Sequence, residues 1–345
     1  MARKEKQNAN PKDIALSLPN YLDEVEVIKS NIFILDHILK GGIELGSSIQ
    51  FIAESGVGKS TLALQLAKNL CKDKRKVVFV DTEASITKEI LDSTGVNEYV
   101  NDSFFYIRES TYDNVEKYLD MYINTGEISL VIIDSLAGLI NKCFTDLNKG
   151  VSVTTNATLY NSRPLTIFMN KYKSLAASKK FGLILINHYR NRVDTMKGTV
   201  IKEYGSKNVK YCSDVILKLT PIKSTSINKD FKDMTNSLTE ATALEIEVIK
   251  SNKTYPNTTF PLCLFYGRGI SNLCNHLYAL MKLEILKKKV SFYELEYEGI
   301  IIKEQGIKNL YDALVSVGFD IERCHLKKVI DYYNQLNSKE KELDI

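Results

Sequence analysis

The stretch QFIAESGVGKSTLALQ, residues 50–65, joins an apolar run to a helical pattern through a glycine-containing turn. The turn follows the phosphate-loop pattern G-x-x-x-x-G-K-[ST], except that Ala53 stands where the first glycine is expected. In such loops, backbone N–H groups and the N-terminus of the following helix face one anion. The first position makes no charge contact, so we expect alanine to be tolerated there if its φ stays negative. The stretch therefore predicts a nucleotide site between a strand and a helix.

Each residue type in this loop suits one part of a nucleotide. Gly56 and Gly58 supply unusual backbone angles. Lys59 is expected to reach the terminal phosphates, and the Ser60 hydroxyl is expected to ligate Mg²⁺. The candidate ATP-binding residues of the loop are Glu54, Ser55, Gly56, Val57, Gly58, Lys59, Ser60 and Thr61. A turn of this composition also caps helices that bind no nucleotide, so the loop alone leaves that alternative open.

Apolar runs alternate with helical patterns on both sides of the loop. The expected strands are 47–53, 76–83, 103–110, 129–138 and 181–188, and the expected helices are 59–73, 84–95, 111–126 and 163–180. Short continuous apolar runs separated by helices predict an α/β fold with a mainly parallel, doubly wound sheet. Further strands at 213–222, 243–252 and 260–267 are expected to extend one edge in antiparallel fashion.

The chain divides into three expected parts. Residues 1–27 form a short N-terminal oligomerisation arm, 28–270 an ATPase core, and 271–345 a small, mainly helical C-terminal domain. The arm contains the apolar cluster IALSLPNYL at 14–22, which is too short to fold alone. We therefore expect the arm to dock on a neighbouring subunit.

Composition excludes several protein classes. Hydrophobic residues make up 44% and charged residues 26% of the chain, as in soluble globular proteins. We find neither a secretory signal nor an apolar run long enough to span a membrane, so we expect a cytoplasmic protein with no membrane partner. The six cysteines show no C-x-x-C spacing, which favours reduced thiols over a disulfide framework or a zinc site.

Basic residues gather in one segment. Between Arg163 and Lys210, eleven basic residues face two acidic ones, a segment charge of +9 in a chain whose net charge is +4. This imbalance predicts a local site for a polyanion. For the lysines at 171–180, which lie in a helical pattern, a solvated helix face is an equally good interpretation.

Acidic residues end two of the predicted strands. Asp134 follows LVII, and Asp81 and Glu83 follow VFV. Asp134 is the candidate partner of Mg²⁺, and Glu83 is the candidate general base for the water that attacks the γ-phosphate. A single acidic residue at the end of a strand is more often a cap or turn residue. The assignment of Glu83 and Asp134 therefore depends on both acidic strand ends occurring in order after the phosphate loop.

Six short motifs occur in an order that is typical of one protein family. GGIELG, AESGVGKST, VDTEASI, VIIDSLAGL, LILINH and FYGRGI follow one another between residues 41 and 270. In this order the chain resembles the RecA recombinase family over residues 28–270. VDTEASI together with INH looks most like the UvsX-type recombinases of bacteriophages, because bacterial RecA has glutamine where this chain has His188. The resemblance implies an ATP-dependent helical filament on single-stranded DNA that exchanges strands with double-stranded DNA. It also implies a bacterial or phage-infected cytoplasm, a recombination mediator and a single-stranded DNA-binding protein.

The resemblance also implies roles for residues outside the loop. His188 matches a γ-phosphate sensor that begins a DNA loop, and Lys250 and Lys253 match cations that reach the neighbouring subunit's ATP. Segments 142–163 and 189–208 match the two DNA-binding loops, with Arg163, Arg190, Arg192 and Lys207 as the candidate contacts. Ile90 stands where an adenine-stacking aromatic is expected, so no adenine contact is assigned.

Two other functions use the same core. One is a helicase-like ring motor, which usually carries a large N-terminal collar, whereas only 27 residues precede this core. The other is an accessory paralogue that binds single-stranded DNA, which would be expected to have lost its catalytic groups. Lys59, Ser60, Glu83 and Asp134 are all present, so the sequence favours the recombinase.

Overall fold

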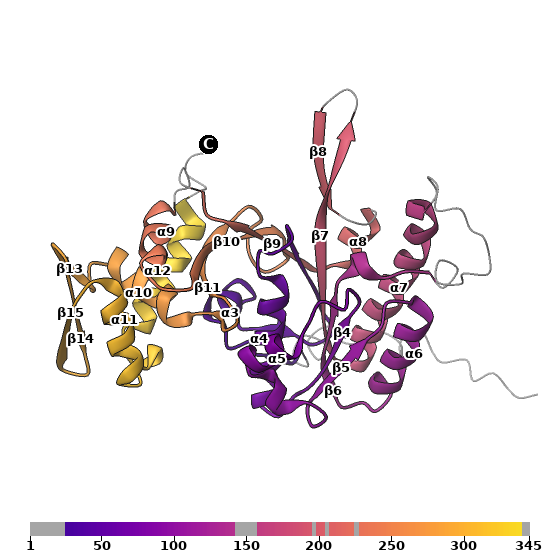
Figure 1. Cartoon of the computed structure of the whole chain (residues 1–345), viewed down its shortest axis with the longest axis horizontal. Helices are drawn as coiled ribbons and strands as arrows, with labels where there is room; N and C mark the ends of the chain where they lie inside the picture. Colours follow the sequence, from indigo (N-terminus) through magenta and orange to yellow (C-terminus); the bar gives the residue numbers. More distant parts are fainter. Residues whose placement is uncertain (1–24, 142–156, 195–197, 204–206, 224–227, 340–345) are drawn as a thin grey trace, which may run out of the picture.

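A mixed sheet runs through the middle of the computed structural model, which describes residues 25–141, 157–194, 198–203, 207–223 and 228–339 (Figure 1). Residues 1–24 of the expected N-terminal arm lie outside these ranges. Ten strands of the described part form the sheet, in the order β12-β11-β10-β9-β3-β7-β6-β4-β5, with β8 paired to β7. Their bounds are β3 Ser48–Ala53, β4 Lys76–Asp81, β5 Phe104–Arg108, β6 Ile128–Asp134, β7 Gly182–Asp194, β8 Gly198–Glu203, β9 Val215–Pro221, β10 Ala241–Lys250, β11 Thr259–Phe265 and β12 Gly269–Ile270.

Strand direction confirms the predicted fold class. The strands from β9 to β5 in this order are parallel, and β10, β11 and β12 extend the sheet in antiparallel fashion beyond β9. Parallel strands place their carboxyl ends at one edge, so the residues that follow β3, β4 and β6 come together in space beside His188, where the parallel pairing of β7 with β3 ends.

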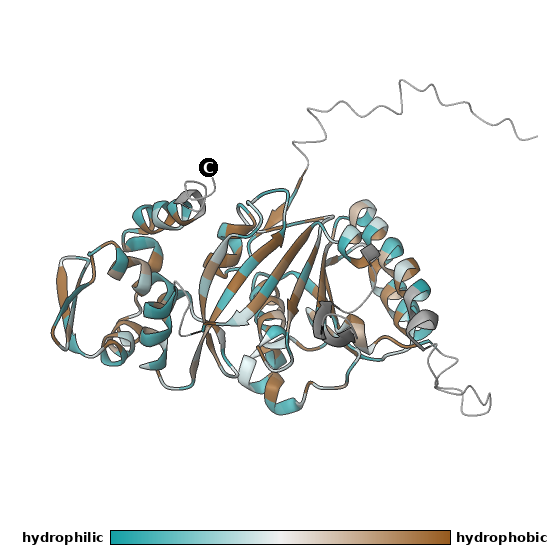
Figure 2. Cartoon of the chain, turned by 90° about the horizontal axis from the view of Figure 1, so that it is seen from above, coloured by the Kyte–Doolittle hydropathy of each residue, from teal (hydrophilic) through white to brown (hydrophobic). Residues whose placement is uncertain are grey.

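Helices cover both faces of the sheet (Figure 2). On β4, Val77 and Phe79 belong to one buried cluster, whereas Val78 and Val80 belong to the other. The first cluster includes side chains from α4, and the second includes side chains from α6 and α7. This arrangement explains why the strands are continuously apolar. The helices beside the parallel strands are α4 Lys59–Lys72, α5 Lys88–Thr94, α6 Tyr112–Ile123 and α7 Ala157–Lys179.

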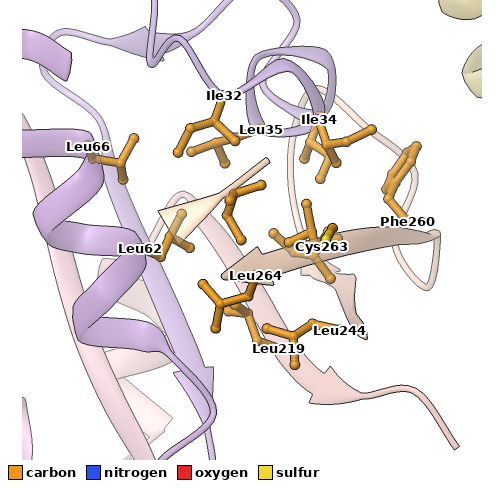
Figure 3. Close-up of a cluster of buried hydrophobic side chains, with 14 of the residues drawn as sticks. Ile32, Ile34, Leu35, Leu62, Leu66, Leu219, Leu244, Phe260, Cys263 and Leu264 are labelled. Carbon is orange, nitrogen blue, oxygen red and sulfur yellow. The ribbon is translucent and has the colours of Figure 1, made fainter. Parts of the chain in front are cut away.

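The first buried cluster continues into the N-terminal and antiparallel parts of the chain (Figure 3). Ile34 from α3 (Phe33–Ile38), Leu62 from α4 and Leu264 from β11 converge there. Near α3, a short antiparallel pair is formed by β1 (Val27–Ile28) and β2 (Ile43–Glu44). Helix α9 (Lys229–Asn236) follows β9, and the described residues also include 3-10 helices at Val96–Tyr99, Leu136–Gly138 and Ile321–Arg323.

The C-terminal part differs from the mainly helical expectation. It contains α10 (Asn272–Lys282), α11 (Ile307–Ser316) and α12 (Leu326–Lys339), but also an antiparallel sheet of β13 (Lys287–Lys289), β14 (Phe292–Tyr297) and β15 (Ile300–Gln305). Leu295 and Tyr297 are buried while Glu296 between them is exposed, which is the alternation of a half-buried strand. The lysine run before β14 obscured this pattern in the sequence.

The two expected DNA loops are more regular than predicted. Helix α7 begins at Ala157, so residues 157–163 of the first segment are helical, and 142–156 lie outside the described residues. In the second segment, β7 continues to Asp194 and pairs with β8 as a projecting hairpin, and α8 (Lys207–Cys212) follows (Figure 1). The described part of 189–208 is therefore more regular than the weakly periodic loop that we expected, because β7 and β8 hydrogen-bond to each other along their facing edges.

Two smaller observations complete the fold. The five cysteines within the described residues are free and buried, and Cys143 lies outside those residues. None of the helices in the described ranges combines the length and apolar composition that crossing a membrane requires.

Candidate active site

The glycine-containing turn lies between β3 and α4, as predicted. Ala53 is the fully buried last residue of β3, so its backbone is extended and requires no glycine. Gly56 and Gly58 have φ of +78° and +107°, values that residues with a side chain rarely adopt. A Cβ on Gly58 would also lie 2.3 Å from Cδ2 of Leu264. The altered first position therefore leaves the loop intact, whereas position 58 admits only glycine.

Lys59 is the first residue of α4, and its ammonium group reaches back to the residues that begin this loop. Its Nζ donates to the carbonyl oxygens of Ala53 (3.1 Å) and Glu54 (2.7 Å), and only 4% of the residue is exposed. Burial lowers the pKa of Lys59 to about 8, against the opposing effect of the nearby Asp134 and Glu83 carboxylates. Placing an anion beside this ammonium group would favour its charged form.

Asp134 ends β6 beside the loop. Burial raises the pKa of this carboxyl to about 6; a hydrogen bond from Ser60 lowers it, and the carboxylates of Glu83 and Asp81 raise it further. Oδ2 of Asp134 is buried and has no hydrogen-bond partner within the described residues. A buried carboxylate oxygen beside a serine hydroxyl suits a hydrated divalent cation.

The described residues contain no group of three or more His, Cys, Asp or Glu side chains arranged to hold a metal ion. A cation at Ser60 and Asp134 would therefore take its remaining oxygen ligands from phosphate groups and water. This is how Mg²⁺ is usually held in nucleotide sites.

Glu83 lies where the ends of β4 and β6 meet the middle of β7. Its Oε1 accepts a hydrogen bond from Oγ of Ser135, and Nε2 of His188 lies 3.3 Å from the same oxygen. The sheet register explains the meeting, because Asp81 pairs with Asp134 and Ala53 pairs with His188. The structure thus brings together Lys59, Ser60, Glu83, Asp134 and His188, which lie far apart in the sequence.

Thr82 and Ser135 support this site, and sequence reasoning missed both. Oγ1 of Thr82 donates to the Ser135 carbonyl (2.7 Å) and accepts from the Ser135 N–H (2.8 Å), while the Thr82 N–H donates to the Asp134 carbonyl (2.7 Å). Gly138 allows this close approach, since a Cβ there would lie 2.3 Å from Oγ1 of Thr82 and 3.0 Å from Cγ of Glu83. The available signal was a hydroxyl residue beside an acid in both VDTE and IDSL.

Lys250 and Lys253 lie away from the nucleotide loop of their own chain. Lys250 Nζ donates to the carbonyls of Lys210 (3.0 Å) and Ser213 (2.6 Å), and Lys253 Nζ lies 2.6 Å from Oε2 of Glu44. Lys250 pairs with Ile216 near the beginning of β9, whereas the loop follows the end of the parallel neighbour β3. Both lysines are therefore near the opposite end of the sheet, where Lys253 also lines a cavity of about 230 Å³.

The candidate DNA contacts are spread over three elements. Arg163 is exposed on α7, the backbones of Arg190 and Arg192 lie in β7, and Lys207 is the first residue of α8.

Two lysines of the helical run have structural partners instead. Lys171 Nζ bonds to Glu116 and Asp120, each at 2.8 Å, and Lys173 Nζ lies 2.7 Å from Oδ1 of Asp214. Lys171 and Lys173 are therefore engaged in ion pairs within the chain.

Comparison with known proteins gives a consistent result. The model of the RecA N-terminal domain matches residues 3–271. Protein RecA of Mycoplasma mycoides subsp. mycoides is 27% identical over 280 residues, which cover 80% of this chain and 76% of that protein. Protein RecA of Mycobacteroides abscessus is 25% identical over 303 residues, covering 87% and 82% of the two chains. Protein RecA of Rickettsia prowazekii is 25% identical over 309 residues, covering 88% and 86%.

Proposed function

This chain belongs to the RecA family and is an ATP-dependent recombinase, and we propose that the groups gathered around Glu83 carry out its DNA-dependent ATP hydrolysis. Proteins of this family use ATP and assemble on DNA. One observation carries the assignment: the phosphate loop, Glu83 and Asp134 meet at the carboxyl ends of β3, β4 and β6, beside His188 of β7. That edge of a parallel sheet is where ligands bind.

Within this site each residue has a distinct task. The backbone of residues 54–61 cradles the phosphates, and Lys59 neutralises charge on the terminal ones. Mg²⁺, held by Ser60 and supported by Asp134, would supply further positive charge at the phosphates. Glu83 accepts the proton of the attacking water, and its position beside His188 connects the base to the group that senses the γ-phosphate.

Lys250 and Lys253 act on the ATP of a neighbouring subunit. Their place near the amino ends of the parallel strands supports this role, because they do not approach the loop of their own chain. Positive groups supplied from a second subunit stabilise the charge that develops during phosphoryl transfer. Each ATP then lies between two subunits, so hydrolysis depends on assembly into a helical filament.

DNA contacts come from the basic segment. Arg163, Arg190, Arg192 and Lys207 bind the phosphates of single-stranded DNA, a mode that tolerates any sequence and weakens with salt. The filament then pairs with double-stranded DNA, and a recombination mediator and a single-stranded DNA-binding protein assist loading. The N-terminal arm, residues 1–27, joins neighbouring subunits.

His188 suggests a bacteriophage origin. The motifs VDTEASI and INH resemble those of UvsX-type phage recombinases, in contrast to the glutamine of bacterial RecA. Because the substrate is DNA, we place the activity in the cytoplasm of a bacterium or of a phage-infected host.

Electron microscopy of the full chain with single-stranded DNA and ATP tests the proposal directly. Helical filaments are the expected result, and they should be lost when Mg²⁺ is chelated. Closed rings on DNA would favour a ring motor instead. DNA binding without any ATP hydrolysis would favour an accessory paralogue.

A further inference from the structure

The short loop after β4, residues 82–86, carries Glu83 and is held by an extensive network. Asp81 is only 1% exposed, and its carboxylate accepts hydrogen bonds from three backbone N–H groups of this loop. The donors are Glu83 at 3.2 Å, Ser85 at 3.3 Å and Ile86 at 3.0 Å. Asp81 therefore fixes the backbone from which the Glu83 side chain extends.

A second strand completes this network. The hydroxyl of Tyr106 on β5 donates to Oδ2 of Asp81 at 2.7 Å, and Nη2 of Arg108 donates to the carbonyl oxygen of Ala84 at 2.7 Å. Ala84 has a φ of +52°, a conformation that a residue with a side chain adopts only when its surroundings hold it there. Two side chains of one edge strand thus hold the loop at both its beginning and its middle.

We propose that Tyr106 and Arg108 are positioning residues for ATP hydrolysis, which hold Glu83 at the attacking water by fixing the loop at Asp81 and Ala84. The inference rests on the proposed role of Glu83 as general base. Neither side chain touches the nucleotide loop in this mechanism; both act on the geometry of the base. Small displacements of a catalytic group reduce turnover strongly, whereas substrate binding at residues 54–61 is left unchanged.

Tyr106→Phe is the sharpest test, because it removes one hydroxyl and leaves the ring. We expect kcat of DNA-dependent ATP hydrolysis to fall by about tenfold while KM for ATP stays within about twofold. Affinity for single-stranded DNA with a nonhydrolysable ATP analogue should equal that of the parent. Arg108→Gln should give the same split between kcat and KM.

Matched controls separate positioning from simple loss of stability. Tyr172→Phe also removes a hydroxyl that bonds to a carboxylate, since Tyr172 donates to Oδ1 of Asp120 at 3.1 Å on the far side of the core. Arg268→Gln is the control for Arg108→Gln, because it makes the same change at an exposed arginine whose Nη2 lies 3.6 Å from Oε2 of Glu240. Both controls should keep the parental kcat even if their thermal unfolding temperatures fall.

A combination with Glu83→Gln decides whether the effect passes through the base. If it does, adding Tyr106→Phe to Glu83→Gln should cause no further loss of kcat, because the two changes remove one function. A multiplicative loss, or a parental kcat in Tyr106→Phe alone, would overturn the positioning role and leave the base assignment standing. Near-parental turnover in Glu83→Gln alone would overturn both.

Discussion

Nε2 of His188 lies 3.3 Å from Oε1 of Glu83, although His188 lies within β7, Glu83 follows β4, and the two residues are more than a hundred positions apart. The contact joins the candidate base to the strand that continues as the β7–β8 hairpin, where the second DNA segment begins. If His188 senses the γ-phosphate as proposed, a change at the nucleotide would reach the hairpin through this one side chain.

From this contact we predict the effect of His188→Ala. The variant should bind ATP through its intact loop but lose the increase in single-stranded DNA affinity that ATP causes. The measurement compares DNA affinity with a nonhydrolysable ATP analogue and with ADP, in the parent and the variant. An unchanged ratio between the two would exclude His188 as the coupling residue, and His325→Ala, at an exposed histidine, is the control.

Glu83→Gln tests the base itself. The amide still accepts the hydrogen bond that Ser135 gives to Glu83, so the site should keep its shape. Nucleotide and DNA binding should persist while hydrolysis falls by about 10²-fold or more. Glu127→Gln, at an exposed glutamate paired with Lys76, should hydrolyse ATP normally. Normal turnover in Glu83→Gln would assign the base to another residue.

The positions of Lys250 and Lys253 predict complementation between two inactive variants. A chain with Lys250→Ala and Lys253→Ala keeps its loop, and a chain with Lys59→Ala keeps both trans lysines. Each alone should hydrolyse ATP very slowly, whereas a mixture on single-stranded DNA should regain activity at the junctions between the two. If the mixture remains as inactive as its components, the lysines do not act across subunits.

Gly138→Ala should impair the site from a position that touches no nucleotide. The added methyl group would lie 2.3 Å from Oγ1 of Thr82 and 3.0 Å from Cγ of Glu83. We expect kcat to fall more than affinity for ATP, together with a loss of about 1–3 kcal/mol in the free energy of unfolding. Steady-state kinetics and urea unfolding measure the two effects. A variant with parental kcat would show that the Thr82 region moves without consequence.

A buried histidine outside the active site predicts how stability depends on pH. Burial lowers the pKa of His37 from 6.5 to about 4, and Lys40 lowers it further in the same direction. As the pH falls, the His37 side chain of the unfolded chain is therefore protonated before that of the folded chain. The contribution of neutral His37 to the free energy of unfolding is fully present above about pH 6.5 and is lost as the pH falls toward about 4.

His37→Phe should remove part of that loss. Nε2 of His37 has no hydrogen-bond partner in the described residues, and the ring packs against Phe33, Phe260 and Tyr333. Between pH 7.5 and pH 5, we expect the free energy of unfolding to decrease by about 2 kcal/mol less in the variant than in the parent. Urea unfolding of both proteins at the two pH values measures this difference. An equal decrease in both proteins would refute the assignment.

The nucleotide site was largely predictable because its signals are local. A strand, a glycine turn and Lys59 are contiguous, so residues 50–65 specify both the conformation and the chemistry. Glu83 and Asp134 followed from the rule that parallel strands place their carboxyl ends together. The β13–β15 sheet and the β7–β8 hairpin were missed, because the lysine run of β13 and the polar residues that begin the hairpin, such as Arg190, Asn191 and Arg192, lack the apolar alternation that identifies strands.

What the sequence determined by itself was the fold class, the phosphate loop and the identity of the acids at the strand ends, since each depends on neighbouring residues. Only the tertiary structure decided how those groups are held. The contacts of Glu83 with Ser135 and His188, and of Asp81 with Tyr106, join different strands through the register of the sheet. These strands are parallel, so no hairpin turn fixes their register, which depends on how the apolar side chains of several strands pack together across both faces of the sheet.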